Sequence, residues 1–196
     1  MTHDGVIPFS KLEHLFDSLK VMTIATPWEN GVWSAPLYYL YKNRAFWFFS
    51  SPNSRHIIGS KTYPEMVVAA SIFWDDLKFS NIKGLQMRGK IEEVNTIDNM
   101  KSGLNNMKNG LNILSVVSAY IKKFGIPLGE SIKSSTLRDS RNLRNPRETN
   151  NRIDEVLAFF QKHYRSQLYK FAPTEMIYMD NSINIGFKQN VKLEEM

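Results

Sequence analysis

The spacing of apolar residues assigns an element to each stretch of the first 94 residues. Between Phe9 and Leu19 they recur at three and four positions, which predicts a helix. Short runs rich in β-branched and aromatic residues predict strands at 21–26, 32–41, 44–50, 65–74 and 85–94. The run at 65–74 is continuous, so we expect it to be buried on both faces. Asn30-Gly31 predicts a tight hairpin turn.

Helical spacing dominates the middle of the chain, and strands return at its end. We expect helices at 97–107, 111–124 and 152–164, with a break near Gly110, and strands at 168–172, 176–180 and 187–193. Pro36 falls inside the second strand. Because proline donates no ladder hydrogen bond, it predicts a sheet edge, a bulge or a point where something other than a strand lies alongside. Closely spaced antiparallel strands with one crossing helix favour a small β-barrel.

The stretch from Arg44 to Thr62 combines a strand, a polar turn and the start of a helix. Ser51 is expected to cap this helix and Pro52 to be its first residue. Arg55 and His56 then lie in the first helical turn, where cations are unusual because the helix dipole favours them at the other end. Cations among hydroxyls and free backbone N–H groups predict a bound anion, best a phosphate. The alternative is an ordinary turn that binds nothing.

Composition limits the chemistry. The 196 residues include no cysteine, which excludes disulfides and thiolate metal sites, and the four histidines show no metal-ligand spacing, so no metal is expected. Of the net charge of +6, +5 falls between residues 122 and 152. This basic segment is a solvated insertion, a lid over an anionic substrate or a nucleic-acid contact. Nucleic acid is disfavoured because 125–151 holds no aromatic residue to stack on bases.

The N-terminal residues lack the charged and apolar regions of a signal peptide, and no apolar stretch approaches the roughly 20 residues of a membrane span. We therefore expect a cytoplasmic protein without a membrane segment.

The run VMTIATPWENGVWSAPLYYLYKNRAFWFFSSPNSRHIIGSKTYPEMVVAASI resembles the FMN-binding split barrel of pyridoxamine 5′-phosphate oxidase and its relatives. The similarity covers about residues 21–94. The segments 83–94 and 171–191 look closer to the YhbP-like branch of that fold, in which a Gly-aliphatic-Gln run and an Asp-Asn turn ending in Gly-Phe-Gly recur. This chain reads Gly186-Phe187-Lys188 and lacks the second glycine. The resemblance implies a single, mainly β domain with α-helices. It would be a six- to seven-stranded antiparallel split barrel with flanking helices and a helical, basic insertion at about 97–165.

In that family a strand end and the Ser-Arg-Lys turn after it hold the flavin phosphate. The matching residues are Phe49-Ser50 and Ser54-Arg55-His56, so His56 stands where the family has lysine, which implies weaker or pH-dependent phosphate binding. Together with the residue-based expectation, this puts the phosphate on four residues: Ser50, Ser51, Ser54 and Arg55. The flavin ring would lie along Ser34, Ala35, Pro36 and Leu37, with Gln86 as a hydrogen-bonding partner. Otherwise Pro36 is a plain edge proline and Gln86 a surface glutamine.

The expected function is an FMN-binding flavoprotein that oxidises or reduces an unknown small molecule. Its catalytic residues remain unidentified, because a flavin carries the hydride chemistry itself. One alternative is a flavin- or heme-binding protein without turnover on the same scaffold, and another is a nucleic-acid-associated protein that uses the basic insertion. The resemblance also implies a homodimer with the cofactor between its subunits.

Overall fold

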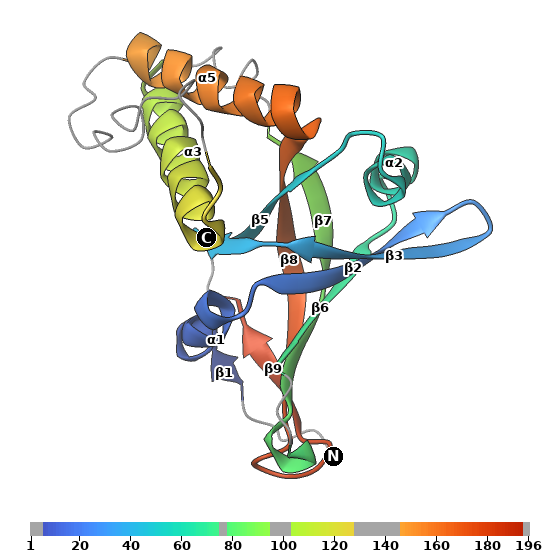
Figure 1. Cartoon of the computed structure of the whole chain (residues 1–196). Coiled ribbons are helices and arrows are strands. Elements are labelled where there is room, and N and C mark those ends of the chain that lie inside the picture. Colours follow the sequence, from blue (N-terminus) through green and yellow to red (C-terminus); the bar gives the residue numbers. More distant parts are fainter. Residues whose placement is uncertain (1–5, 75–77, 95–102, 128–145, 194–196) are drawn as a thin grey trace. The chain divides into compact units, whose positions relative to one another are not determined.

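The computed structural model describes residues 6–74, 78–94, 103–127 and 146–193 (Figure 1). The chain divides into two compact units, the first formed by 1–48, 52–92 and 170–196 and the second by 49–51 and 93–169. The first unit holds most of a β-sheet and the second a pair of long helices. None of the helices in the described ranges is both long and apolar enough to cross a membrane.

The sheet contains nine strands within the described residues: β1 (Ile7–Pro8), β2 (Val21–Trp28), β3 (Gly31–Tyr38), β4 (Leu40–Lys42), β5 (Ala45–Ser50), β6 (Val68–Trp74), β7 (Lys83–Glu93), β8 (Gln167–Asp180) and β9 (Lys188–Lys192). Four short helices accompany them: η1 (Phe9–Lys11), α1 (Glu13–Ser18), α2 (Arg55–Thr62) and η2 (Phe79–Asn81).

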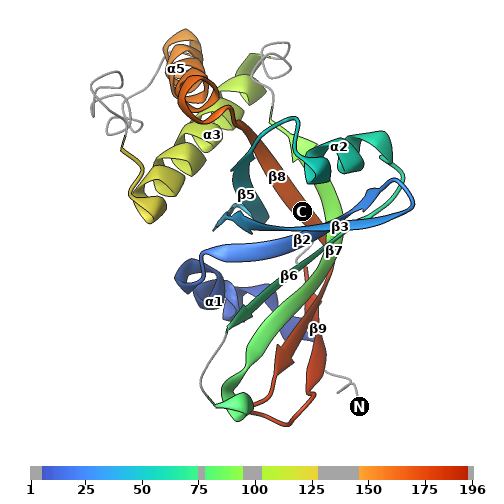
Figure 2. The same ribbon diagram turned by 45° about the vertical axis from the view of Figure 1, so that its right-hand side comes forward.

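The strands follow the order β1-β9-β8-β7-β6-β2-β3, and β5 pairs with both β4 and β8 (Figures 1 and 2). The pairs β2–β3, β2–β6, β6–β7, β4–β5 and β8–β9 are antiparallel, whereas β1 runs parallel to β9. The expected mainly β, antiparallel fold is confirmed, although the sheet is not closed. The resemblance implied six or seven strands, and the sheet has nine because it also includes the short strands β1 and β4.

One face of β2, β6 and β7 carries the core of the first unit. It buries Met22, Ile24, Val68, Ala70, Ile72, Leu85 and Met87. The strand expected at 65–74, which is β6, is not buried on both faces as we expected, because Ala69, Ser71 and Phe73 are exposed on its other face. Pro36 lies on β3, which ends the strand order, so its expected place at a sheet edge is confirmed.

The helix α2 begins three residues later than expected. Ser54 is its N-cap residue, in extended conformation, and the Ser54 carbonyl accepts bonds from the N–H groups of Ile57 (3.0 Å) and Ile58 (2.9 Å). Ser51 is therefore not the cap and Pro52 not the first residue, because Pro52 and Asn53 form the turn that precedes the helix.

Gly59 lets α2 lie directly on β2. A Cβ atom at this position would sit 2.0 Å from the Pro27 carbonyl oxygen and 3.3 Å from the Thr26 hydroxyl oxygen. Thr26 is fully buried there, and its hydroxyl finds no hydrogen-bond partner within the described residues. Both views show α2 beside the β2–β3 hairpin (Figures 1 and 2). The contact depends on the absence of a side chain at residue 59.

The strand β8 runs unbroken through Pro173-Thr174, where we expected a turn between two strands. At this point Gly89 of β7 approaches so closely that a Cβ atom would lie 2.1 Å from the Ala172 carbonyl oxygen. The Thr174 hydroxyl also donates to the Arg88 carbonyl (3.2 Å). These contacts with β7 hold the proline segment straight, which local sequence preference does not reveal.

The second unit packs α3 (Gly103–Phe124) against α5 (Pro146–Tyr164). The expected break near Gly110 is wrong, since one glycine inside a helix costs only about 1 kcal/mol and the apolar stripe continues beyond it. The stripe buries Leu114, Val117 and Ile121. Most of the basic segment, including Arg138, Arg141 and Arg144, lies outside the described residues.

Substituting Gly59 tests the contact between α2 and β2. We expect Gly59→Ala to lower the free energy of unfolding by about 1–3 kcal/mol, because the added methyl group overlaps backbone that must move. Urea denaturation measures the change. Gly31→Ala is the matched control, because no atom lies within 4 Å of its Cβ position, and we expect a change below about 0.5 kcal/mol. Equal losses in the two variants would contradict the close approach.

Candidate functional site

Arg55 is the residue of the predicted phosphate turn with the most distinctive surroundings. It is exposed in the first turn of α2, and its guanidinium lies over the Trp33 ring, 4.3 Å from the centroid, with Trp28 at 5.7 Å. Arg55 makes no ion pair with any carboxylate in the described part of the chain. Cation–π contacts hold a guanidinium in place without neutralising it. Its N–H donors can therefore bind an anion that approaches from solvent.

His56 does not supply a second cation. Its side chain is buried, with 7% exposed, and its Nε2 atom lies 3.2 Å from the Ser54 hydroxyl. Burial lowers the pKa of the His56 imidazole, so the ring is neutral at neutral pH. At this turn the anion-binding charge rests on Arg55, beside the N–H groups that begin every helix.

Three other predicted residues belong to the second unit. The Phe49 ring stacks on Phe160 with centroids 3.7 Å apart and lies 5.2 Å from Tyr120, so it is part of an aromatic cluster with α3 and α5. Ser50 is buried and Ser51 half-buried. Cofactor binding by these three residues stays a prediction from the sequence.

The predicted ring-binding residues of β3 alternate between the two faces of the sheet. Ala35 and Leu37 point into the core, whereas Ser34 and Pro36 are exposed. β3 ends the strand order, so its outer edge is unpaired within the described sheet. A planar ligand can reach the β3 backbone along this edge, where Pro36 lacks an N–H group.

Gln86 lies in the same row of the sheet as Pro36. The register pairs Pro36 with Thr23, Thr23 with Ser71, and Ser71 with Gln86. Directly paired residues point to the same face, and three strand spacings separate Pro36 from Gln86 by about 14 Å. The two predicted residues therefore share an exposed face but are not neighbours.

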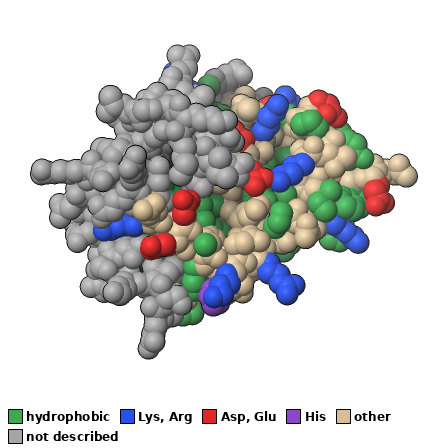
Figure 3. All heavy atoms as spheres, turned by 90° about the horizontal axis from the view of Figure 1, so that it is seen from above, with side chains coloured by type: hydrophobic (Ala, Val, Ile, Leu, Met, Phe, Trp, Pro, Cys, Tyr) green, Lys and Arg blue, Asp and Glu red, His purple; other side chains and the backbone are tan. Residues whose placement is uncertain are grey.

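The exposed face of β2, β3, β6 and β7 consists largely of small side chains. The row next to Pro36 pairs four residues, Ser34, Ala25, Ala69 and Arg88. Larger apolar side chains on the same face are exposed: Val32 by 73%, Tyr38 by 61% and Phe73 by 62%. Figure 3 shows one view of the surface, in which apolar side chains lie among basic and acidic ones. The exposed face of β2, β3, β6 and β7, with its large apolar side chains, therefore suits contact with a flat partner.

Sequence reasoning missed the two tryptophans that hold Arg55. The only available signal was the hairpin predicted at Asn30-Gly31; the observed turn, Glu29-Asn30, sets the register. That register pairs Trp28 with Gly31 and Trp33 with Thr26, so both rings lie on the β2–β3 face that α2 covers. Finding them also requires knowing that α2 packs on that face.

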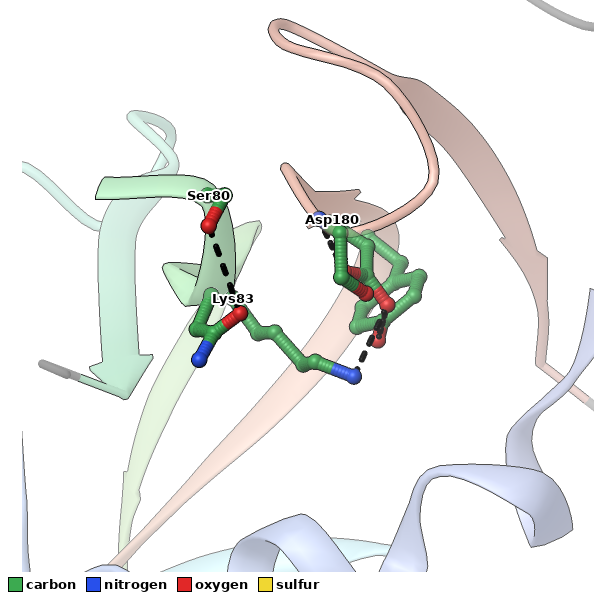
Figure 4. Close-up of polar contacts among 6 residues, drawn as sticks. Ser80, Lys83 and Asp180 are labelled. Atoms are coloured by element: carbon green, nitrogen blue, oxygen red, sulfur yellow. Dashed lines mark hydrogen bonds and ion pairs between the residues drawn. The ribbon is translucent and has the colours of Figure 1, made fainter. Parts of the chain in front are cut away.

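A second polar cluster surrounds Asp180, at the end of β8, and is structural. The buried carboxylate accepts hydrogen bonds from the Tyr178 hydroxyl (2.7 Å) and from the Ser182 N–H (2.9 Å) and hydroxyl (2.5 Å). The Lys83 ammonium lies 3.1 Å from Oδ2, the oxygen that also accepts from Tyr178, as Figure 4 shows, whereas both Ser182 bonds go to Oδ1. Next to it, Asn181 donates to the Phe79 carbonyl and accepts from the Gly186 N–H. These bonds fix the Asp-Asn turn noted in the sequence to the start of β7.

The hydrogen bonds decide the charge of Asp180. Burial alone would raise the pKa of this carboxyl, but the bonds from Ser182, Tyr178 and Lys83 outweigh burial and hold the pKa below its ordinary value. Burial and the neighbouring Asp180 raise the pKa of Tyr178, so its hydroxyl keeps its proton and donates. No group of three or more His, Asp or Glu side chains able to hold a metal occurs within the described residues.

Comparison with family models and with curated proteins found no match. Among solved structures, the conserved hypothetical protein Rv2991 from Mycobacterium tuberculosis matches with a TM-score of 0.58 and 10% identity, over 92% of this chain and 90% of that one. ChuZ from Campylobacter jejuni matches with a TM-score of 0.58 and 13% identity, over 94% of this chain but only 59% of ChuZ.

A FAD-binding protein from Mesorhizobium loti matches more distantly, with a TM-score of 0.47 and 12% identity, over 87% of this chain and 90% of that one. At these identities the similarity concerns the fold. The match to Rv2991 supports the mainly β fold with helices that the sequence led us to expect, and this fold is consistent with a split barrel whose sheet is not closed.

Removing the Asp180 charge tests the role of its cluster. We expect Asp180→Asn to lower the free energy of unfolding by about 1.5–3 kcal/mol at pH 7, the usual worth of hydrogen bonds to a charged group. The folded-state pKa is lowered, so this contribution is complete above the ordinary value of 3.8 and is lost as the pH falls through the folded-state pKa. Denaturant unfolding from pH 7 to pH 3 should show the two proteins converging in acid.

The control is Glu175→Gln, which breaks the Arg88–Glu175 ion pair. That pair has the same 3.1 Å separation but is more than half exposed, so we expect a loss below about 1 kcal/mol. A wild-type advantage over Asp180→Asn that is the same at pH 3 and pH 7 would contradict the assignment.

Proposed function

We propose that this chain is a flavoprotein that binds FMN at the β3 edge, with the phosphate on Arg55 and the start of α2. The observation that carries this proposal is the guanidinium of Arg55, exposed, held on Trp33 and without a carboxylate partner among the described residues. A cation fixed in that way beside a helix N-terminus matches a dianionic phosphate in charge and in hydrogen-bond donors.

The β3 edge offers a place for the flavin ring. Ser34 and Pro36 are exposed there, and the backbone of an edge strand presents unpaired donors and acceptors that can bind the polar rim of a ring. Ala35 and Leu37 anchor the same strand in the core, so the edge is rigid. A planar ligand therefore meets a fixed surface and not a mobile loop.

The proposed activity is the oxidation or reduction of a small molecule. A bound flavin supplies the hydride chemistry, and the residues of this chain bind it, orient it and control solvent access. A cofactor fixed at an exposed edge also needs a cover, since water must be kept from the reacting atoms.

A second copy of the chain is the proposed cover. The face that includes Ser34 and Pro36 also exposes Val32, Tyr38 and Phe73, and large exposed apolar side chains on one face favour protein contact. Antiparallel strands with small side chains between larger ones suit packing against an identical face. The proposal is a homodimer with the flavin beside its interface.

Replacing Arg55 tests the phosphate anchor. We expect Arg55→Ala to weaken FMN binding by roughly 1.5–3 kcal/mol, or about tenfold to a hundredfold, because the charged hydrogen bonds to phosphate are lost. Quenching of flavin fluorescence on titration measures the affinity. Lys61→Ala is the control, because it removes the same charge from the last turn of the same helix. If Arg55→Ala binds FMN as the wild type does, the anchor is wrong.

Charging the exposed sheet face tests the dimer. We expect the wild type to be a dimer by light scattering after gel filtration, and Phe73→Lys to be monomeric because an ammonium cannot be buried in an apolar contact. Phe79→Lys is the control, since Phe79 is equally exposed (63%) but lies on η2, off this face. Two dimeric variants, or a monomeric wild type, would contradict the proposed interface.

A further inference from the structure

The first unit contains a cavity that the proposed flavin site does not use. Its volume is about 550 Å³, within the range of small-molecule sites. Residues of η1, the β4–β5 turn, β7 and β8 line it, among them Phe9, Tyr41, Arg44, Lys90 and Pro173. It shares no lining residue with the β3 edge or the α2 turn.

The walls of this cavity are preformed. Phe9 and Tyr41 are buried, with ring centroids 4.9 Å apart, and Tyr41 packs in turn on Phe46 at 5.0 Å. Another part of the lining, Ala172 to Thr174, is held by the close approach of Gly89 and by the bond from the Thr174 hydroxyl to the Arg88 carbonyl. A ligand that enters need not order this site, which lowers the cost of binding.

The charges at the cavity favour an anionic group. Glu92 is paired with Lys170, whose ammonium lies 2.9 Å from its carboxylate, so its charge is compensated. The other charged residues that line the cavity are Arg44, Lys90 and Glu13. Lys90 is exposed and makes no ion pair with another described residue. Its ammonium can therefore receive a carboxylate.

We infer that this cavity binds a small aromatic carboxylate, with its ring against Phe9 and Tyr41 and its carboxylate at Lys90. Aromatic walls favour a planar apolar body, because rings gain from stacked and edge contacts in addition to burial. The cation at the rim then orients the molecule. This inference does not depend on the flavin proposal.

Isothermal titration with 2-naphthylacetate and with 2-(2-naphthyl)ethanol tests the chemistry, because the alcohol keeps the ring and lacks the charge. We expect the carboxylate to bind about tenfold more tightly. Equal affinity of the two probes, or no heat from the carboxylate, would overturn the inference.

Two variants test the location. We expect Lys90→Glu to weaken 2-naphthylacetate binding about tenfold, because it exchanges attraction for repulsion, and to leave the alcohol unaffected. Lys20→Glu makes the same charge change at an exposed residue that does not line the cavity, and should have no effect. Ser10 is exposed and lines the cavity, so Ser10→Trp should abolish binding of both probes without disturbing the core. Unchanged binding in Lys90→Glu or in Ser10→Trp would place the ligand elsewhere.

A titration in the presence of saturating FMN separates this site from the proposed flavin site. We expect the same affinity for 2-naphthylacetate with and without FMN. Competition between the two would overturn the independent site.

Discussion

The contact between Gly59 and the Pro27 carbonyl is the constraint on which the candidate site depends. A side chain at residue 59 would overlap that carbonyl, so α2 can lie this close to β2 only because residue 59 is glycine. This approach brings the first turn of α2 to the end of the β2–β3 hairpin, where Trp28 and Trp33 receive Arg55. A structural contact in the interior thus sets the place of an exposed cation.

Successive side chains of β3 point to opposite faces of the sheet, and the two faces have different surroundings. Trp33, Ala35 and Leu37 face the side that α2 and the core occupy, whereas Ser34 and Pro36 face solvent. The strand also ends the strand order, so its outer edge is unpaired within the described sheet. One short hairpin therefore supplies the aromatic support of the cation and the sheet edge at which we propose that the flavin binds.

Local patterns predicted most strands, because each is short, apolar and bounded by turn residues. Asn30-Gly31 predicted the first hairpin, although its turn residues are Glu29 and Asn30, and Gly31 already pairs with Trp28. Local patterns gave wrong or incomplete predictions where contacts with residues distant in the sequence determine the structure. The unbroken β8 depends on Gly89 of another strand, and the neutral state of His56 depends on burial that no local pattern shows. The sequence placed Arg55 in the first turn of a helix, as observed, but the tryptophans that support Arg55 come from a hairpin more than 20 residues earlier.

Comparing FMN with riboflavin tests the central claim most directly, because the two differ only by the phosphate. If the guanidinium of Arg55 and the start of α2 hold that phosphate, equilibrium titration of the wild-type protein should show FMN binding at least about tenfold more tightly than riboflavin. Equal affinities, or no binding of either flavin, would contradict the account.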